Sequence, residues 1–517
     1  MHDHLGTDRI RQPGRALHGL TDLPPIRTMK LLSDNSLHCV PSHVVRPAYD
    51  RRRLVNGIVH LGLGAFHRAH QALYTEAVIT RGDMRWGTVG VSLRDAAVPT
   101  ALHPQDLLYS VTERHGEQAH TRVVGALREA LHAPLALRRV VEAIADPQAA
   151  IVSTTVTEKG YSQNPATSDL DLDDPAIRHD LQHPDTPQST LGVLVAGIRL
   201  RAPTAPLTLL CCDNMANNGA TFRKLLLQYA ALVDPSLARR IETDIAFPNS
   251  MVDRIVPAAT PASLREAEAL LGMRDQAAIV CEPFTQWVIE DRFAGPRPAW
   301  ETVGALLTDD VRPYQAMKLR LLNGTHSAIA YAGQLCGLET VADAMAHPVV
   351  GRFARRLMRE NLLQTVRAPG GFDGAAYCAD LLNRFENPSL AHRTQQIAMD
   401  GTQKVPVRWL PALRESLLAG AELPQLEQAL ALWLHYLCAG QDESGRTLVI
   451  SDPGAGDLAA RMRGAGDAAG AVAAAFEQNS VFGSDPWPAP FVARIAAGLS
   501  VLRQSGVAAL LERAAPH

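Results

Sequence analysis

The chain has 517 residues with 46% hydrophobic content, and its 50 basic and 53 acidic residues give a formal net charge of −3. This length exceeds what one hydrophobic core usually organises, so we expect two domains. The lack of a basic surplus excludes the charge pattern of nucleic-acid-binding proteins, and it makes an anionic membrane surface a poor partner.

The sequence carries no sign of export, membrane insertion or metal binding. No apolar run reaches transmembrane length, and the first residues, MHDHLGTDRIRQPGR, lack the apolar region of a secretory signal. The seven cysteines form no CxxC pair, which is typical of reduced thiols. The 19 histidines form no HExxH motif or Cys/His ligand cluster. We therefore expect a cytoplasmic protein without a metal ion.

The first 45 residues are polar and rich in Arg and Pro without clear periodicity, which predicts a flexible N-terminal extension over residues 1–45. Met29 is a candidate start of the natural protein. From Arg46 onward, strand-like apolar runs alternate with helix-like stretches, which is typical of βαβ units in a mainly parallel sheet. The clearest predicted strands cover residues 58–61, 88–93, 149–156 and 207–212, and the clearest helices cover 191–201 and 220–233.

A glycine turn follows the first predicted strand, in HLGLGAFHRAH from His60. Glycines let the backbone approach a pyrophosphate, and the helix that follows offers free amides and the positive end of its dipole. His67 replaces the third glycine of GxGxxG, so the fingerprint is incomplete, and a plain strand-to-helix turn with a solvated arginine is the alternative. The predicted cofactor contacts in this segment are Gly62, Gly64, Ala65, Phe66 and Arg68.

Two further turns bear on the choice of cofactor. Asp95 follows the second predicted strand, where a carboxylate can bind the adenosine ribose hydroxyls and repel a 2′-phosphate. Arg94 favours NADP instead, and its separation from the glycine turn exceeds the usual Rossmann distance. Glu158 ends the third predicted strand and either lines the cofactor cleft or lies in an ordinary loop. Of the two cofactors we predict NAD(H).

A segment that bears glycine and proline, FAGPRPA at residues 293–299, is the best domain boundary. Beyond it nearly every periodic run is helical, as at residues 424–437. The predicted fold class is therefore α/β, with a Rossmann-type, mainly parallel dinucleotide-binding domain over residues 46–298. A mostly α-helical substrate and catalytic domain follows over residues 299–517, and the cleft between the two domains is the expected site.

The run KLRLLNGTH from Lys318 brings together an amine, an amide and an imidazole. On a helix of about 3.6 residues per turn, Asn323 lies about 140° and His326 about 80° round from Lys318, so all three project from one side. Burial can lower the lysine pKa from about 10.4 toward neutrality, where the amine exchanges a proton with an alcohol. This arrangement suits the reduction of a carbonyl, and an ordinary amphipathic helix is the alternative.

Several separated blocks of the sequence resemble the polyol-specific long-chain dehydrogenases, the mannitol dehydrogenase family, in the family's order from about Arg46 to the C-terminus. Within this family the chain is most similar to the fructuronate reductases (D-mannonate oxidoreductases), through MVDRIVPAATP from Met251 and NPSLAHRTQQIAMDGTQK from Asn387. The other blocks are HLGLGAFHRAHQALYTE from His60, TVTEKGY from Thr155, CDNMANNG from Cys212, FPNSMVDRIVP from Phe247, CEPFTQWVIED from Cys281 and MKLRLLNGTHS from Met317.

The resemblance implies a metal-independent, NAD-dependent oxidoreductase that reversibly reduces D-fructuronate to D-mannonate in hexuronate catabolism. It implies that two asparagines hold the substrate oxygen, that the lysine transfers the proton and that the histidine positions the substrate. Asp253 is implied to lie near the nicotinamide or the substrate. The residues alone leave open an Asx turn at Asn214 and a salt bridge between Asp253 and Arg254. The implied catalytic residues are Lys318, Asn323, His326 and Asn214.

Fructuronate carries a carboxylate that neutral polyols lack, so its reductase needs a cationic group near the far end of the substrate. His392, Arg393 and Lys404 are the candidates, although each can also be merely solvated. Gln315 stands where related polyol dehydrogenases can carry an acidic residue, which leaves no carboxylate at this position for a proton path.

Two other functions remain open. A neutral-polyol enzyme, mannitol 2-dehydrogenase or D-arabinitol 4-dehydrogenase, would use the same catalytic residues. A catalytically silent sugar-acid sensor would retain only the nucleotide fold, and the intact lysine, asparagine and histidine argue against it. In each case a small sugar acid or polyol is the expected partner, and we expect a monomer or a small homo-oligomer.

Overall fold

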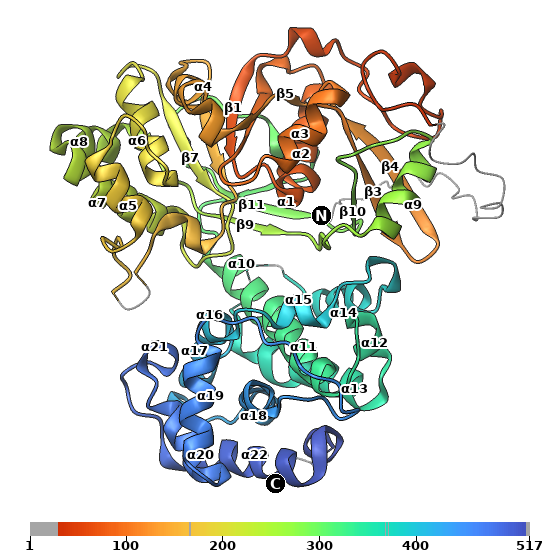
Figure 1. Ribbon diagram of the computed structural model, residues 1–517, viewed down its shortest axis with the longest axis vertical. Coiled ribbons are helices and arrows are strands. Elements are labelled where there is room, and N and C mark those ends of the chain that lie inside the picture. Colours follow the sequence, from red (N-terminus) through yellow and green to blue (C-terminus); the bar gives the residue numbers. More distant parts are fainter. Residues whose placement is uncertain (1–28, 165–166, 368, 371, 513–517) are drawn as a thin grey trace, which may run out of the picture.

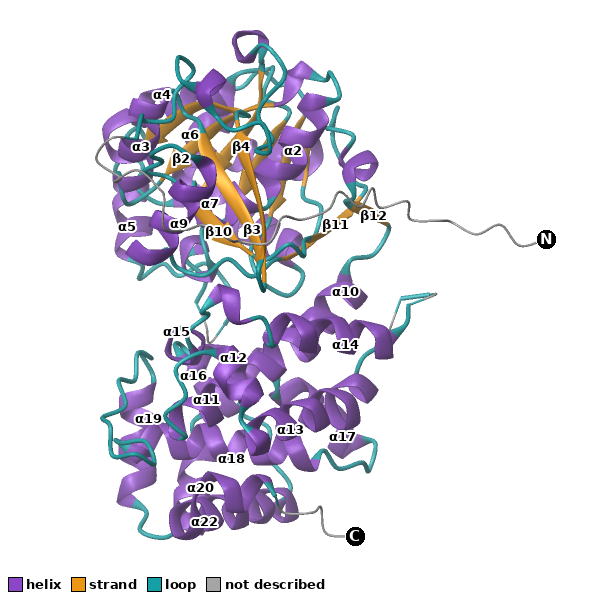
Figure 2. Ribbon diagram, turned by 90° about the vertical axis from the view of Figure 1, so that its right-hand side faces the viewer, coloured by secondary structure: helices purple, strands orange, loops and turns teal. Residues whose placement is uncertain are grey.

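The computed structural model describes residues 29–164, 167–367, 369–370 and 372–512. The chain forms a sheet-bearing half and then passes at α10 (Arg312–Met317) into a helical half (Figure 1). Turned by 90°, the molecule shows its strands gathered in the first half and its helices packed together in the second (Figure 2). The predicted α/β class with a mostly helical second half is confirmed.

The central sheet is parallel, with the strand order β5-β2-β1-β6-β7-β8. The chain winds outward from β1 in both directions, as in doubly wound nucleotide-binding folds, so a crevice opens where β1 and β6 end. The four predicted strands all appear, within a few residues of their expected bounds. The strands of this sheet are β1 (Asn56–Leu61), β2 (Gly87–Ser92), β5 (Leu127–His132), β6 (Ile151–Thr154), β7 (Leu207–Cys211) and β8 (Ile245–Ala246).

Helices cover both faces of the central sheet. Val59 and Leu61 of β1 share a core with α4, α6 and α7, whereas Ile58 shares a core with α1 and α2 on the opposite face. Neighbouring residues of a strand point to opposite faces, so the apolar run of β1 serves both cores. The helices of this half are α1 (Ala65–Ala69), α2 (Gln71–Thr80), α3 (Ala97–Leu102), α4 (Ala133–Ala145), α5 (Pro175–Gln182), α6 (Thr190–Leu200), α7 (Asn218–Val233), α8 (Pro235–Asp244) and α9 (Pro261–Leu271).

Short strands extend this half beyond the predicted pattern. β3 and β4 form a hairpin beside β10, and β11 pairs with both β9 and β12. β12 lies beyond the boundary predicted at residue 298, because its pairing with β11 holds it to the sheet-bearing half. The bounds of these strands are β3 (Tyr109–His115), β4 (Gln118–Val124), β9 (Ser250–Asp253), β10 (Ile279–Cys281), β11 (Gln286–Glu290) and β12 (Leu306–Thr308).

The N-terminal extension expected over residues 1–45 packs against the sheet-bearing half in its described part. Leu32, Val40 and Val44 are buried in a small apolar cluster with Leu108 and Leu271. The burial of these side chains holds residues 29–45 to the domain. Residues 1–28 lie outside the described residues.

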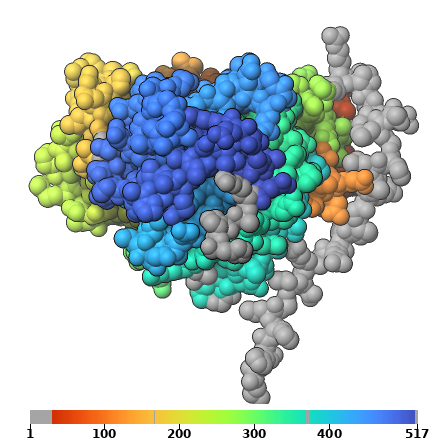
Figure 3. All heavy atoms as spheres, turned by 90° about the horizontal axis from the view of Figure 1, so that it is seen from below, coloured from red at the N-terminus to blue at the C-terminus, as the bar shows by residue number. Residues whose placement is uncertain are grey.

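The helical half packs around α11 and α18, and the helix predicted at residues 424–437 is confirmed as α18. Viewed from this end, the surface is formed mainly by the blue C-terminal residues (Figure 3). The helices are α11 (Thr325–Leu335), α12 (Val341–Ala346), α13 (Pro348–Arg356), α14 (Gly374–Phe385), α15 (Thr394–Ala398), α16 (Gly401–Arg408), α17 (Leu410–Leu418), α18 (Pro424–Ala439), α19 (Ala455–Gly464), α20 (Ala468–Phe476), α21 (Asn479–Phe482) and α22 (Ala489–Leu511).

Candidate active site

The glycine turn forms one wall of a cleft of about 420 Å³ at the carboxyl end of the central sheet. Gly62 has a φ of +105°, and a Cβ atom there would lie 2.1 Å from the carbonyl oxygen of Thr155. Only glycine therefore fits at this position, where the turns after β1 and β6 approach each other closely. The cleft is also lined by Gly64, Arg94, Asp95, Val156, Thr157 and Lys159.

His67, at the third position of the fingerprint, packs α1 against β1 by ring stacking. Its ring centroid lies 3.4 Å from that of His60, with an angle of 13° between the planes. Nδ1 of His60 lies 2.8 Å from Ser153 Oγ, and its Nε2 lies 2.8 Å from Thr155 Oγ1. Burial lowers the pKa of His60 to about 3, so its ring is neutral. Two stacked imidazoles thus replace the close helix–strand contact that a glycine gives elsewhere.

Asp95 lies where the sequence predicts it, in the turn after β2, beside Arg94 and exposed at the edge of the cleft. Its Oδ1 also accepts a hydrogen bond from the backbone N–H of Ala97 at 2.7 Å, at the start of α3. Glu158 is exposed at the start of a short 3₁₀ segment, Glu158–Tyr161, after β6. Ala65 is exposed at the first position of α1.

Arg68 is a predicted cofactor contact that the structure does not bring to the cleft. Its guanidinium is buried and donates to the carbonyl oxygen of Ala277 at 2.6 Å, over the ring of Tyr109. The turn of α1 directs this side chain away from the glycine turn and into the domain. Phe66 likewise packs inward, with its ring 5.1 Å from that of His70.

The catalytic run is a π-helix over Lys318–Gly324, between α10 and α11, and not the regular α-helix that we expected. A π-helix closes hydrogen bonds from residue i to residue i+5. Asn323 therefore lies one turn beyond Lys318, and the spacing of 3.6 residues per turn overstates the angle between them. Such π-helical turns are frequent at functional sites.

The ammonium of Lys318 sits at the junction of the two halves. Its Nζ donates to Oδ1 of Asn214, after β7, and to the carbonyl oxygen of Val252, in β9, both at 2.5 Å. The Asn214 side chain is exposed, whereas Lys318 is 6% exposed. The amide of Asn323 is also buried, and its side chain has no hydrogen-bond partner among the described residues. The structure thus brings together the predicted lysine and Asn214 across the domain boundary.

Burial lowers the pKa of Lys318 to about 8. The charge of Asp253 opposes this shift, and the charges of Arg384 and Arg408 add to it. An amine with this pKa can both donate and accept a proton near neutral pH.

Asp253 binds an arginine that the sequence did not single out. Arg384 of α14 forms two hydrogen bonds to Asp253, at 2.8 and 3.0 Å, and two to Glu282, at 2.7 and 2.8 Å. Burial alone would raise the pKa of Asp253, but Arg384, with smaller contributions from Lys318 and His70, lowers this pKa below its usual value. Arg254 binds Glu113 at 2.6 Å instead, so the neighbours Asp253 and Arg254 do not pair with each other.

His326 lies in a buried group of rings on the helical side. It stacks on Phe385 with centroids 4.9 Å apart, and His392 meets it edge-on at 4.9 Å. Nζ of Lys404, on α16, donates to the carbonyl oxygen of Ile397 at 3.2 Å. Burial lowers the pKa of His326 well below its usual value, and the charges of His392, Arg408, Arg384 and Lys404 add to this shift.

The exposed Arg393 precedes α15, and the structure shows no side-chain partner for it among the described residues. Its backbone forms a bridge with Thr340 instead. Of the three candidates for a carboxylate site, His392 contacts His326 and the charge of Lys404 acts on both rings, whereas Arg393 makes no such contact. Burial lowers the pKa of His392 to about 4, so its ring is neutral and Lys404 is the cation of this group.

Comparison with known proteins decides the family. The mannitol dehydrogenase Rossmann domain matches residues 56–302, and the mannitol dehydrogenase C-terminal domain matches residues 310–502. The chain belongs to the mannitol dehydrogenase family. It is 43% identical to a D-mannonate oxidoreductase of Escherichia coli (strain K12), over 90% of this chain and 96% of that protein. It is 38% identical to a mannitol 2-dehydrogenase of Aspergillus terreus, over 85% of this chain and 89% of that protein.

A solved structure of the mannitol dehydrogenase family has the same fold. The mannitol 2-dehydrogenase of Pseudomonas fluorescens, in a ternary complex with NAD and D-mannitol, superposes with a TM-score of 0.86 at 35% identity. The match covers 93% of this chain and 98% of that one. The protein is therefore an oxidoreductase whose sheet-bearing half is a Rossmann domain.

The sequence does not mark residues of the site whose partners are distant in the chain. The Nε2 of Gln315 donates to the carbonyl oxygen of Ser250 at 2.9 Å, and its Oε1 accepts from the N–H of Asn217 at 3.0 Å. Asp213 accepts hydrogen bonds from the Thr157 N–H and the Tyr161 hydroxyl, which joins the turns after β6 and β7. No local motif marks either role.

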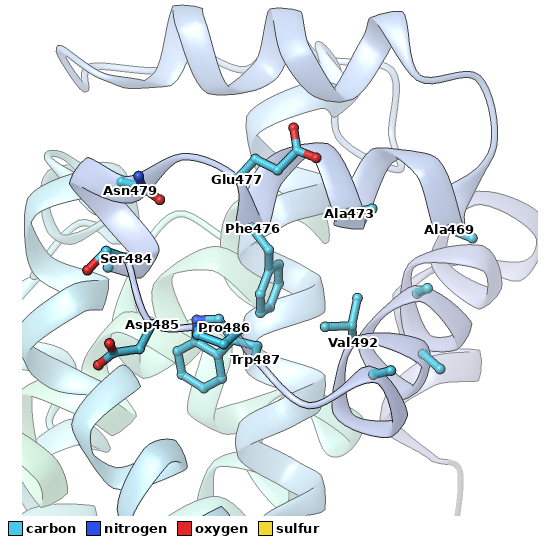
Figure 4. A pocket seen from close by; sticks show the side chains of 14 residues that line it. Ala469, Ala473, Phe476, Glu477, Asn479, Ser484, Asp485, Pro486, Trp487 and Val492 are labelled. Carbon is cyan, nitrogen blue, oxygen red and sulfur yellow. The ribbon is translucent and has the colours of Figure 1, made fainter.

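A second cavity, of about 480 Å³, lies in the helical half between α20 and α22 (Figure 4). Phe476, Trp487 and Val492 form its apolar wall, and none of the predicted site residues lines it.

In the part of the chain that the structure describes, every helix is too short or too polar to span a lipid bilayer.

Proposed function

We propose that this member of the mannitol dehydrogenase family reversibly reduces D-fructuronate to D-mannonate with NADH. The observation that carries the reaction type is the buried Lys318 ammonium, 2.5 Å from the Asn214 amide oxygen. The 43% identity to a D-mannonate oxidoreductase supports the substrate, as do the cationic Lys404 and Arg408, whose charges act on His326.

The proposed mechanism assigns one task to each side chain. NADH, when bound at the glycine turn, supplies the hydride to the C5 carbonyl carbon. Asn214 accepts from Lys318 through its Oδ1, so its Nδ2 can donate to the carbonyl oxygen, and the buried Asn323 amide provides a second donor. The Lys318 ammonium then transfers its proton to the developing alkoxide.

In the reverse direction the neutral Lys318 amine accepts the proton of the C5 hydroxyl. A pKa of about 8 makes both protonation states accessible near neutral pH. His326 is neutral, because burial and neighbouring cations lower its pKa, so we assign it to positioning the substrate hydroxyls.

The proposal includes NAD(H) as the cofactor. The carboxylate of Asp95 at the cleft edge can bind ribose hydroxyls and repel a 2′-phosphate, although Arg94 lies beside it. Steady-state kinetics test this choice, with a higher kcat/KM expected for NADH than for NADPH. The opposite ranking would reject NAD(H).

A neutral-polyol dehydrogenase is the second candidate, favoured by the TM-score of 0.86 to a mannitol 2-dehydrogenase. A substrate panel separates the two. NADH oxidation by the purified protein would be measured with fructuronate, tagaturonate, fructose and xylulose. We expect the highest kcat/KM with fructuronate, and a clear preference for fructose or xylulose would establish the second candidate instead.

A further inference from the structure

Arg408 is a half-buried arginine beside the catalytic run with no carboxylate partner among the described residues. At the end of α16, its Nη1 donates to the carbonyl oxygen of Asn323 at 3.3 Å and to Ser327 Oγ at 2.7 Å. Those acceptors are neutral and no ion pair balances the guanidinium charge, although the charge of Glu158 acts on it from beyond ion-pair distance. Arg384, a buried arginine of the same site, binds two carboxylates. A buried cation usually has an anionic partner.

Lys404 stands four residues before Arg408, one helical turn away on α16. Like Arg408, it has no carboxylate within ion-pair distance among the described residues, and its Nζ donates only to a neutral carbonyl oxygen there. Burial and the charge of Arg408 lower the pKa of Lys404 to about 8, as expected for two cations held close together. One face of α16 therefore presents two cations that form no ion pair among the described residues, and the charges of Asp400, Glu158 and Asp452 offset that of Lys404 only in part.

The position of this pair relates it to the reacting atoms. Arg408 holds the backbone of Asn323, whose side-chain amide is a proposed donor to the carbonyl oxygen. Its Nε and Nη2 atoms have no hydrogen-bond partner in the described part of the chain, so the fork can still bind a planar anion. Figure 1 shows α16 at the edge of the helical half that faces the sheet-bearing half.

We propose that Arg408, supported by Lys404, binds the carboxylate of the sugar acid and thereby selects acids over neutral polyols. Arg408 replaces the exposed Arg393 in this role. This inference rests on the proposed function for the identity of the acid. The competing explanation is that Arg408 only caps the carbonyl end of the π-helix, which would affect acid and neutral substrates alike.

The test compares Arg408→Gln with wild type on fructuronate and on a neutral ketose, each with NADH. We expect kcat/KM for fructuronate to fall about 10- to 100-fold, mainly through KM, because a charge-assisted pair is lost. We expect the neutral ketose to change less than about threefold. Equal losses on both substrates would overturn the proposal and leave the capping role.

Arg414→Gln is the matched control. Arg414, on α17, also donates to backbone carbonyl oxygens and has no carboxylate partner among the described residues, but it stacks on Trp487 at the second cavity. Both kcat/KM values should stay unchanged. An acid-specific loss in Arg393→Gln and none in Arg408→Gln would return the role to Arg393. Should Arg408→Gln not fold, Arg408→Lys, which keeps the charge and loses the fork, carries the same comparison.

The experiment also separates failure of this inference from failure of the proposed function. If wild type reduces only a neutral ketose, the proposed function fails, and D-mannonate is then tested as a competitive inhibitor of that reaction. Inhibition that weakens at least about tenfold in Arg408→Gln would retain the carboxylate site. Absence of inhibition, or equal inhibition of both proteins, would reject it.

Discussion

Lys318 of the helical half donates to Asn214 of the sheet-bearing half across 2.5 Å. Gln315, one turn earlier, donates to the backbone of Ser250 in the other half, and Arg384 binds Asp253 there. These contacts join the halves around one ammonium group. The site therefore exists only when the halves are docked, which makes the domain contact part of the catalytic machinery.

Lys318→Ala is expected to lower kcat for ketone reduction at least about 10²-fold, because the proposed proton donor is lost. The NADH dissociation constant, measured by fluorescence titration, should change little, since the glycine turn is built by β1 and β6. Lys224→Ala is the control, because Lys224 forms an exposed pair with Asp169 and neither residue lines the cleft. Near-normal turnover in Lys318→Ala would overturn the assignment.

The pKa of Lys318, about 8, predicts opposite pH dependences for the two directions of the reaction. Reduction needs the ammonium, so its kcat/KM should be constant below pH 8 and fall about tenfold per pH unit above it. Oxidation needs the neutral amine, so its kcat/KM should rise toward pH 8 and then level off. Parallel pH profiles for the two directions would argue against the lysine as the proton carrier.

The fold followed well from periodicity, because its strands and helices are local patterns. The apolar runs of β1, β2, β6 and β7 predicted a parallel sheet. The glycine- and proline-bearing segment near residue 295 predicted a change to helices, whereas the last strand, β12, ends only at Thr308. The hairpin of β3 and β4 was missed because each strand combines a buried end with a polar, more exposed end, so neither carries a continuous apolar run.

The site could be predicted where its functional side chains are close together in the sequence, as they are from Lys318 to His326. It was not predictable where the partners are distant in sequence. Arg384 lies 131 residues from Asp253 and 102 from Glu282, so no local spacing connects them. The π-helix was also missed, because a helical wheel with 3.6 residues per turn assumes the hydrogen bonds between residues i and i+4 of an α-helix, which this segment lacks.

Arg384→Met is expected to destabilise the protein by about 3–5 kcal/mol at pH 7, because Asp253 and Glu282 would be buried without their counter-ion. Chemical denaturation measures this cost. Arg312→Met, which removes an arginine from a mostly exposed pair with Asp310, is the control and should change little.

The cost of Arg384→Met should depend on pH. In the wild type the pKa of Asp253 is lower in the folded state than in the unfolded state. Its ionised carboxylate therefore stabilises the fold at pH values above the unfolded-state pKa, and this stabilisation is lost as the pH falls through the folded-state pKa. In the variant the two buried carboxylates have no counter-ion, so they are more stable in the protonated form. The free energy of unfolding of the variant should therefore rise as the pH falls. The stability difference should therefore narrow from pH 7 toward pH 4, and a constant difference would contradict the buried-pair explanation.

Gly62→Ala tests whether the close approach of two turns builds the cofactor cleft. Gly62 has a φ of +105°, and an added Cβ would meet the Thr155 carbonyl oxygen at 2.1 Å. Gly82 has nearly the same φ, +108°, but its Cβ would meet nothing within 4 Å. Gly82→Ala should therefore cost only backbone strain, about 1–3 kcal/mol in unfolding free energy.

Gly62→Ala should show the same strain and, in addition, a displaced turn after β6, so its NADH affinity should fall at least about tenfold. Because the two glycines share a backbone conformation, the difference between the variants isolates the steric clash. Fluorescence titration with NADH provides the comparison. If both variants bound NADH as tightly as the wild type, then shifting the backbone at Gly62 would not disturb the bound pyrophosphate. The glycine turn would then not be the cofactor-binding turn.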